Sequence, residues 1–268
     1  YSSRAGYDFL IQAMGGLMSV TGEAESKPGG GPQKIGVALS DILTGLYTVI
    51  GALSALAYRE KTGRGQHVDM SLLDVTVASM ANQAMNYLVA GKSPTTMGNA
   101  HPNIVPYEAY KAADHYIILA VGNDTQFRRF CEVAGRVDLA DDDSYATNRN
   151  RVGNRDVLGP ILNDIIAAKP RAFWLEELEK VGVPCGPINN LEQVFDDPHI
   201  KARGVRQEVN HPAVGALPTV ANPIRFSEST IDYDRAPPLL GQHNVDVLQN
   251  LLGIDETTLS KLKDDDIV

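Results

Sequence analysis

The spacing of apolar residues along the chain predicts a protein of mixed helix and strand. Apolar residues that recur every three or four positions are typical of amphipathic helices, whereas short runs rich in β-branched and aromatic residues are typical of strands. The helices expected from this pattern cover residues 7–20, 41–60, 72–90, 124–135, 154–168, 171–181, 242–252 and 256–263, with a further short helix after residue 190. The strands expected cover residues 66–71, 107–112 and 116–121.

Segments rich in glycine and proline separate these elements. Residues 22–34 predict a flexible loop, residues 91–106 a linker or mobile loop, and residues 204–240 an extended tail punctuated by proline. These segments divide the chain into a first domain, a small α+β domain together with its linker, and a C-terminal tail. The boundaries expected for the three parts are 1–92, 93–203 and 204–268.

The helix over residues 41–60 has two unlike faces. One face carries large apolar side chains, which predicts that it packs into a hydrophobic core. The other face has small or short polar side chains, which permit close approach of another backbone or of a ligand. The residues of this small-residue face are Asp41, Thr44, Gly45, Thr48, Gly51, Ala52 and Ala55.

Asp41, at the open end of the small-residue face, has two possible roles. An aspartate just before an apolar run is a favoured N-cap, and its charge suits the positive end of the helix dipole. A carboxylate at a helix start can also act as a covalent nucleophile toward an ester or thioester. Residue types and spacing leave both roles open.

The composition of the chain limits the classes of partner that we expect it to bind. The chain has 268 residues, of which 43% are hydrophobic, and a formal net charge of −9. Its densest basic segment, residues 59–67, also contains Glu60, so we expect no nucleic-acid partner, although a local basic pocket could hold a polyanionic ligand. The two cysteines, Cys131 and Cys185, have no neighbours at metal-ligand spacing, which predicts no metal site and a reducing cytoplasm.

A membrane partner is not expected either, because glycine, serine and threonine interrupt the most apolar helix, over residues 41–60. We therefore expect a cytoplasmic protein, or a mitochondrial one if the source is eukaryotic.

Five segments together resemble the class III CoA-transferase family, also called the CaiB/BaiF family. They are AGYDFLIQAMGGLMSVTG (5–22), GVALSDILTGLYTVIGALSALAYREKTGRGQHVDMSLLD (36–74), GNAHPNIVPYEAYKAAD (98–114), YIILAVGNDTQF (116–127) and GVPCGPINNLEQVFDDPHIKARG (182–204). Within the family, AHPNIVPYEAY and GVPCGPINN most resemble the succinate/hydroxymethylglutarate and glutarate CoA-transferase branch.

The resemblance implies an α/β fold in which an incomplete Rossmann-like large domain is joined to a smaller α+β domain, within an interlocked homodimer. It also implies that an N-terminal part of the family domain precedes Tyr1, and that the tail after residue 204 returns to the large domain. The implied reaction moves CoA between an acyl-CoA and a free acid, expected to be a short dicarboxylic acid. The CoA thioester is then a substrate, and no permanently bound cofactor is expected.

The resemblance also implies roles for individual residues. Asp41 matches the nucleophile that attacks the thioester. Arg4, Ala5, Gly6 and Tyr7 fall in a segment that contacts CoA, where Arg4 would pair with a phosphate or simply be solvated. Gly98, Asn99 and His101 match a mobile loop over the nucleophile, and His101 would either polarise an acyl carboxylate or stabilise a turn.

Two other functions stay open. The same fold hosts 2-methylacyl-CoA racemases, which pair an aspartate matching Asp41 with a histidine, but this sequence has Tyr7 at the histidine position. A neutral phenol is a poor base for an α-proton, which favours the transferase. The second alternative is a non-catalytic fragment whose small-residue face serves only packing between copies of the chain.

Overall fold

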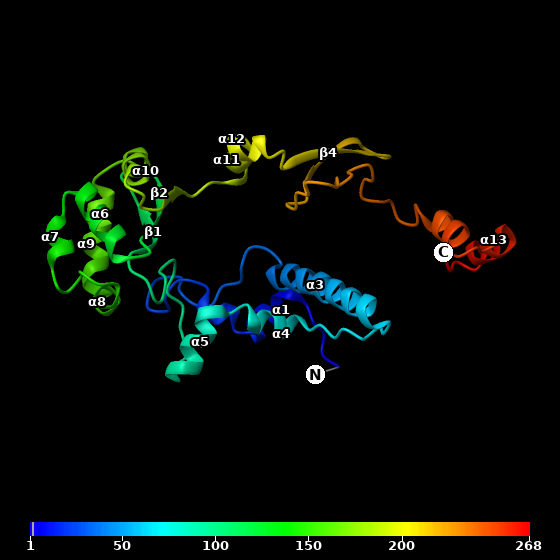
Figure 1. The fold of residues 1–268 in the computed structure, drawn as a ribbon, viewed down its shortest axis with the longest axis horizontal. Coiled ribbons are helices and arrows are strands. Elements are labelled where there is room, and N and C mark those ends of the chain that lie inside the picture. The colour runs from blue at the N-terminus through cyan, green and yellow to red at the C-terminus, as the bar shows by residue number, and fades with distance from the viewer. Residues whose placement is uncertain (2) are drawn as a thin grey trace. The chain divides into compact units, whose positions relative to one another are not determined.

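The computed structural model describes residue 1 and residues 3–268. It divides them into two compact units, residues 1–188 and residues 189–268, which are described separately (Figure 1). Helices and strands are both present, as the sequence predicts. The domain boundaries expected at residues 92 and 203 stay predictions.

The first unit begins with helices only. They are α1 (Asp8–Met14), α2 (Leu17–Val20), α3 (Leu39–Thr62), α4 (Leu72–Ala78) and α5 (Ala81–Ala90). The long α3 ends at Gly63, whose φ of 72° and N–H bond to Arg59 O form a left-handed C-cap.

Three of the predicted elements in this region are wrong. The helix over 7–20 breaks at Gly15 and Gly16, where Gly16 has a φ of 85° and a Cβ on Gly15 would lie 2.6 Å from Thr76 Cγ2. The helix over 72–90 breaks before Ala81, whose φ is 45°. The strand over 66–71 does not form, because no neighbouring strand pairs with its backbone N–H and C=O groups in the described part of the chain.

Helix α3 packs on α1 and α4, and on its small-residue face Thr44 is buried and Gly51 and Ala55 are half-buried. The hydroxyl groups of Ser40 and Thr76 lie 2.8 Å apart and both side chains are buried. Farther along α3, a Cβ on Gly51 would lie 3.0 Å from Val68 Cγ1, so the absent side chain permits this close approach.

The large apolar face of α3 is exposed in the first unit, so the prediction that it packs into a core is wrong for this unit. Leu46, Val49, Ile50 and Leu53 are each between 57% and 60% exposed. Within the first unit, no residue covers these side chains. By length and composition alone, α3 is also apolar enough to cross a membrane.

The rest of the first unit is the small α+β module. Strands β1 (Tyr107–Lys111), β2 (Tyr116–Ala120) and β3 (Cys185–Pro187) form an antiparallel sheet in that order. The helices of the module are α6 (Asp124–Ala134), α7 (Val137–Asp141), α8 (Asn148–Gly153), α9 (Arg155–Ala167) and α10 (Arg171–Lys180). Their apolar faces enclose the main hydrophobic core, whose fully buried members include Ile117, Leu119, Phe130, Leu162 and Trp174.

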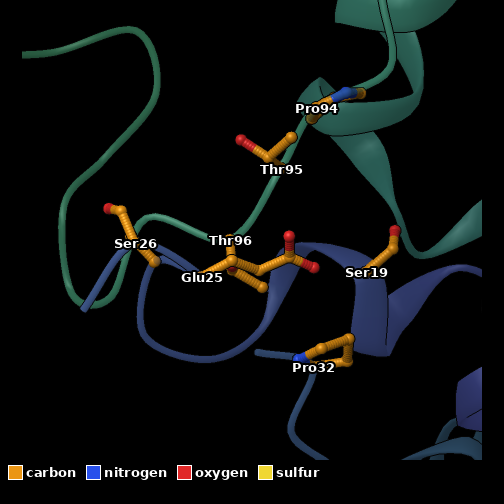
Figure 2. A pocket seen from close by; sticks show the side chains of 8 residues that line it. Ser19, Glu25, Ser26, Pro32, Pro94, Thr95 and Thr96 are labelled. Carbon is orange, nitrogen blue, oxygen red and sulfur yellow. The ribbon is translucent and has the colours of Figure 1, made fainter. Parts of the chain in front are cut away.

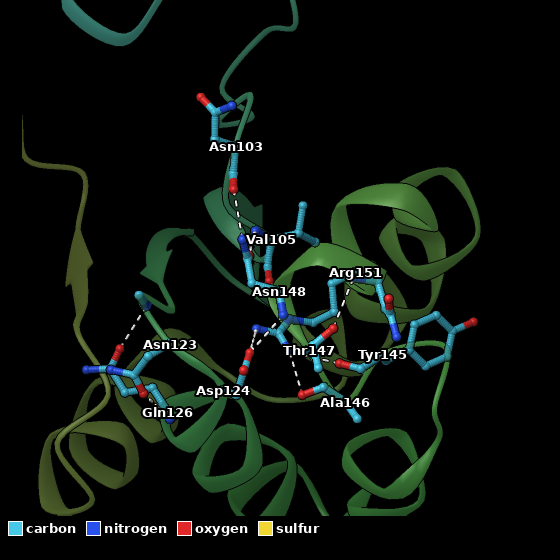
Figure 3. A network of polar contacts seen from close by, with 12 residues as sticks. Asn103, Val105, Asn123, Asp124, Gln126, Tyr145, Ala146, Thr147, Asn148 and Arg151 are labelled. Atoms are coloured by element: carbon cyan, nitrogen blue, oxygen red, sulfur yellow. Dashed lines mark hydrogen bonds and ion pairs between the residues drawn. The ribbon is translucent and has the colours of Figure 1, made fainter. Parts of the chain in front are cut away.

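A buried arginine ties the linker to this module (Figure 3). Arg151 is 0% exposed; it donates from Nε to Val105 O at 2.7 Å and forms an ion pair with Asp124 at 2.8 Å. Its guanidinium also lies 4.3 Å from the centre of the Phe127 ring. Asn148 adds a bond to Asn103 O at 2.9 Å. The linker is therefore anchored at residues 103–105.

The second unit contains α11 (Leu191–Asp196), α12 (Pro198–Ala202), β4 (Arg206–His211), β5 (Gly215–Val220), the π-helix η1 (Asp246–Leu251) and α13 (Glu256–Asp264). Strands β4 and β5 form an antiparallel hairpin, with Val209 opposite Leu217. The extended tail predicted from residue 204 is therefore wrong over these strands. Pro218 lies inside β5, and a proline lowers the strand signal because it cannot donate to a ladder.

Acid is expected to weaken the start of α10 through Asp114. Its carboxylate accepts the Arg171 N–H at 2.7 Å and the His115 N–H at 2.8 Å, and the first of these bonds is the main cause that lowers the pKa of Asp114. Because the folded pKa lies below the unfolded one, the stabilisation is present above the unfolded pKa and is lost as pH falls through the folded pKa.

We therefore expect Asp114→Asn to reduce the pH dependence of thermal unfolding below about pH 5. Asp164→Asn is the control, because the Asp164 carboxylate is exposed and no hydrogen bond to it occurs within the described residues. Equal pH slopes for Asp114→Asn and wild type would contradict the assignment.

Candidate active site

Asp41 lies in the first turn of α3, not at its N-cap. The N-cap is Ala38, which makes no side-chain capping bond, and Asp41 is the third residue of the helix. The prediction that Asp41 caps α3 is therefore wrong. The physical reason is that the chain reaches α3 in a conformation that places Ala38 at the cap, and another carboxylate takes over the capping bonds.

That other carboxylate belongs to Asp8, the first residue of α1. Asp8 Oδ1 accepts the Ser40 N–H at 2.8 Å and the Asp41 N–H at 3.4 Å. Backbone N–H groups in the first turn of a helix lack partners within the helix, so these two bonds satisfy them. Asp8 is thus a capping residue for α3 supplied from a different helix.

Gln12, one turn after Asp8 on α1, holds that carboxylate in place. Its Nε2 donates to Asp8 Oδ2 at 2.7 Å and to Val37 O at 3.3 Å, while its Oε1 accepts the Ile35 N–H at 3.0 Å. The Gln12 side chain is 0% exposed. The only sequence signal for this pair is the four-residue spacing between an acid and an amide on one helical face.

The Asp41 carboxylate is left free for chemistry. Asp41 is exposed, and its carboxylate accepts no hydrogen bond from the residues that the structure describes. The positive end of the α3 dipole stabilises a negative charge at this position. An ionised carboxylate with its lone pairs available can attack an activated acyl group.

Arg4, Ala5 and Gly6 line a hollow of about 370 Å³ beside α1 and the start of α4. Two charged side chains line this hollow, Arg4 and Asp74, and the Arg4 guanidinium lies 4.0 Å from the centre of the Tyr1 ring. Tyr7 directly precedes α1 and is 76% exposed. The hollow therefore has one cationic side chain that can pair with an anionic ligand, together with one carboxylate.

The segment with Gly98, Asn99 and His101 lies against the loop that follows α2. Gly98 has a φ of 64°, and its N–H donates to Gly22 O at 2.8 Å. Asn99 is exposed. This loop is therefore held by backbone contacts at Gly98 and presents Asn99 to solvent.

His101 is held in a turn. Its Nδ1 accepts the Asn103 N–H at 3.1 Å, its ring lies 5.2 Å from that of Tyr107, and Arg155 donates to His101 O at 3.2 Å. Burial, and then the charge of Arg155, lower the pKa of His101. A neutral ring whose Nδ1 is an acceptor carries its proton on Nε2, so that atom can donate to a carboxylate.

These predicted site residues occupy three separate places. Within the described part of the chain, no hydrogen bond or ion pair joins Asp41 to Tyr7, Gly98 or His101. The one connection is through Asp8, the neighbour of Tyr7, which bonds to the backbone of Asp41. The sequence did not indicate Asp8 as part of the site.

Another hollow, of about 460 Å³, does not fit a CoA phosphate. It lies between residues 19–32 and residues 94–96 (Figure 2). Among the residues that line it, Glu25 alone is charged, so this hollow has no cationic side chain to pair with a phosphate. We therefore place the candidate site at Asp41 and the hollow beside Arg4. No cluster of three metal-ligating side chains occurs among the described residues.

Comparison with known proteins decides the family. The model of CoA-transferase family III matches residues 1–244. The chain belongs to CoA-transferase family III. The resemblance seen in the sequence is thereby confirmed.

Relatives in this family include named transferases. The chain is 45% identical over 257 residues to the succinate–glutarate CoA-transferase of Agrobacterium fabrum, covering 96% of this chain and 63% of the relative. It is 38% identical over 261 residues to the succinyl-CoA:glutarate CoA-transferase of Homo sapiens, covering 97% of this chain and 59% of the relative. The chain thus spans about three-fifths of the length of these relatives.

Solved structures of family III proteins have the same fold. A CaiB/BaiF family protein from Brucella suis is 48% identical with a TM-score of 0.74, and the match covers 94% of this chain and 64% of that one. Rv3272 from Mycobacterium tuberculosis is 27% identical with a TM-score of 0.77, over 91% of this chain and 64% of that one. The predicted α/β family III fold is therefore confirmed.

Proposed function

We propose that the protein transfers CoA between an acyl-CoA and a free short dicarboxylic acid, with Asp41 as the nucleophile. The observation that carries the proposal is the free Asp41 carboxylate in the first turn of α3, where Asp8 takes the capping bonds. The relatives named as succinate–glutarate transferases support the dicarboxylic substrate class.

The reaction begins when the Asp41 carboxylate attacks the thioester carbonyl. The C–S bond breaks, CoA leaves as the thiolate, and an acyl–aspartyl anhydride forms. The thiolate then attacks the aspartyl carbonyl, which releases the first acid as its carboxylate and leaves an aspartyl-CoA thioester. The acceptor carboxylate attacks this thioester, the C–S bond breaks, and a second anhydride forms as CoA thiolate leaves. The thiolate then attacks the acceptor's acyl carbonyl, which gives the new acyl-CoA and releases the Asp41 carboxylate.

In this proposal, residues outside α3 bind CoA and the acyl group. Arg4 would pair with a CoA phosphate in the hollow that it lines. His101 Nε2 would donate to the distal carboxylate of a dicarboxylic acyl group. The loop of Gly98 and Asn99 would shield the anhydride from water.

A racemase of 2-methylacyl-CoA is the weaker candidate. Such an enzyme needs a base opposite Asp41, and the residue at that position is the phenol of Tyr7. Incubation in deuterated water distinguishes the two, because a racemase exchanges the α-proton of the acyl-CoA with solvent and a transferase does not.

The direct test of the proposed function is exchange between succinyl-CoA and glutarate, followed by chromatography of the CoA esters. We expect glutaryl-CoA and succinate to form in equal amounts. Hydrolysis to free CoA without glutaryl-CoA, or deuterium in the α-position without exchange, would contradict the proposal. A monocarboxylic acid of similar length serves as the control acceptor and is expected to react poorly.

We also propose a cytoplasmic homodimer, in which polypeptide rather than lipid covers the apolar face of α3. The opposite face of α3 already packs on α1 and α4, and the charged residues Arg59, Glu60 and Lys61 lie in its last turns. Light scattering of the purified protein tests the oligomeric state.

A further inference from the structure

We propose that Asp8 is a positioning residue for the nucleophile, because it caps α3 from α1 and so leaves the Asp41 carboxylate free and fixed in place. This inference rests on the proposed function. It adds a residue that neither contacts the substrate nor takes part in bond making.

The backbone N–H groups in the first turn of α3 have different acceptors. The Leu39 N–H donates to Val37 O at 2.8 Å, whereas the N–H groups of Ser40 and Asp41 donate to Asp8 Oδ1. Asp8 therefore satisfies two donors of the first turn, while the Asp41 carboxylate makes no hydrogen bond within the described residues.

The Asp8 carboxylate is itself held rigidly. Gln12 Nε2 donates to its second oxygen at 2.7 Å, and Gln12 is fully buried with both ends of its amide bonded. A carboxylate bonded through both oxygens has little rotational freedom. The backbone of Asp41 is thereby tied to a buried point of α1.

The neighbouring residue Ser40 adds a second constraint. Its buried hydroxyl lies 2.8 Å from that of Thr76 on α4, and its backbone O accepts a bond from the Thr44 hydroxyl at 2.7 Å. The turn that carries Asp41 is therefore fixed from α1 and from α4. Catalysis by a positioned nucleophile is sensitive to displacement of about 1 Å, which can cost about 100-fold in rate.

The test compares kcat and KM of Asp8 variants in the intact protein. Asp8→Ala removes the acceptor and is expected to lower kcat by about 10- to 100-fold, with KM for succinyl-CoA within about twofold of wild type. Asp8→Asn keeps one acceptor oxygen for the Ser40 N–H but sets an amide NH2 against the donor Gln12 Nε2, so its kcat is expected to lie between those of wild type and Asp8→Ala. Asp8→Glu keeps the charge but moves it by one methylene, and its kcat is expected to fall at least about tenfold.

Asp197 offers a matched control. Its carboxylate caps α12 in the second unit with similar geometry, accepting the His199 N–H at 2.8 Å and the Ile200 N–H at 3.2 Å. Asp197→Ala is expected to lower the melting temperature without changing kcat. If Asp8→Ala does not fold, Asp8→Glu carries the comparison.

Wild-type kcat in the folded Asp8→Ala or Asp8→Glu variant would overturn the inference, as would a loss of kcat in Asp8→Asn equal to that in Asp8→Ala. Failure of the proposed function is distinguishable from either result. It would appear as full activity of Asp41→Asn, whereas failure of the inference alone leaves Asp41→Asn inactive.

Discussion

Asp41→Asn is expected to reduce CoA exchange between succinyl-CoA and glutarate by at least about 1,000-fold. An amide oxygen is a poor nucleophile and cannot form the aspartyl anhydride. The fold should be unaffected, because Asp41 is exposed and does not cap α3. Initial rates with each variant, together with circular dichroism, measure the two effects.

Glu60→Gln is the matched control for this change. It converts an exposed acid to its amide near the other end of the same helix, α3, and is expected to leave the exchange rate unchanged. An Asp41→Asn protein that retains more than about a tenth of the wild-type rate would show that another group accepts the acyl group.

Arg151→Ala is expected to produce the largest loss of stability, about 3–5 kcal/mol in the free energy of unfolding of the first unit. The change leaves the Val105 and Tyr145 carbonyl oxygens without their donor and removes the cation that pairs with Asp124. It also opens a cavity beside the Phe127 ring. Chemical denaturation followed by tryptophan fluorescence measures it, since Trp174 lies in the same module.

Arg136→Ala provides the comparison for Arg151. Arg136 and Asp138 form an ion pair with the same 2.8 Å separation, but both side chains are exposed. Water screens such a pair, so its removal is expected to leave the unfolding free energy close to that of wild type. Similar losses for the two arginine variants would contradict the role given to burial.

The sequence predicts best those elements whose secondary structure follows from their own pattern of apolar residues. Helices α6, α9 and α10 and strands β1 and β2 lie within a few residues of the expected ranges. In each of these elements the apolar residues recur with a single helical or strand period. The elements that pack against them lie nearby in the sequence. The breaks before α2 and α5 were missed because they arise from backbone conformations at Gly16 and Ala81 that the apolar period does not encode.

The candidate site was predictable only in part. The two faces of α3 and the position of Asp41 near its start follow from the sequence alone. The residue that caps α3 does not, because Asp8 lies 32 positions before Ser40 and meets it only in the folded chain. The sequence also does not indicate which face of α3 packs against other helices of the same chain, because large and small side chains can both pack.

The central claim is that the Asp41 carboxylate becomes acylated, and trapping of the intermediate tests it most directly. Protein incubated with succinyl-CoA is treated with hydroxylamine, digested and examined by mass spectrometry. We predict an aspartyl hydroxamate on the peptide that contains Asp41, absent when succinyl-CoA is omitted and absent in Asp41→Asn. An unmodified Asp41 peptide during active exchange, or a hydroxamate on a different residue, would contradict the account.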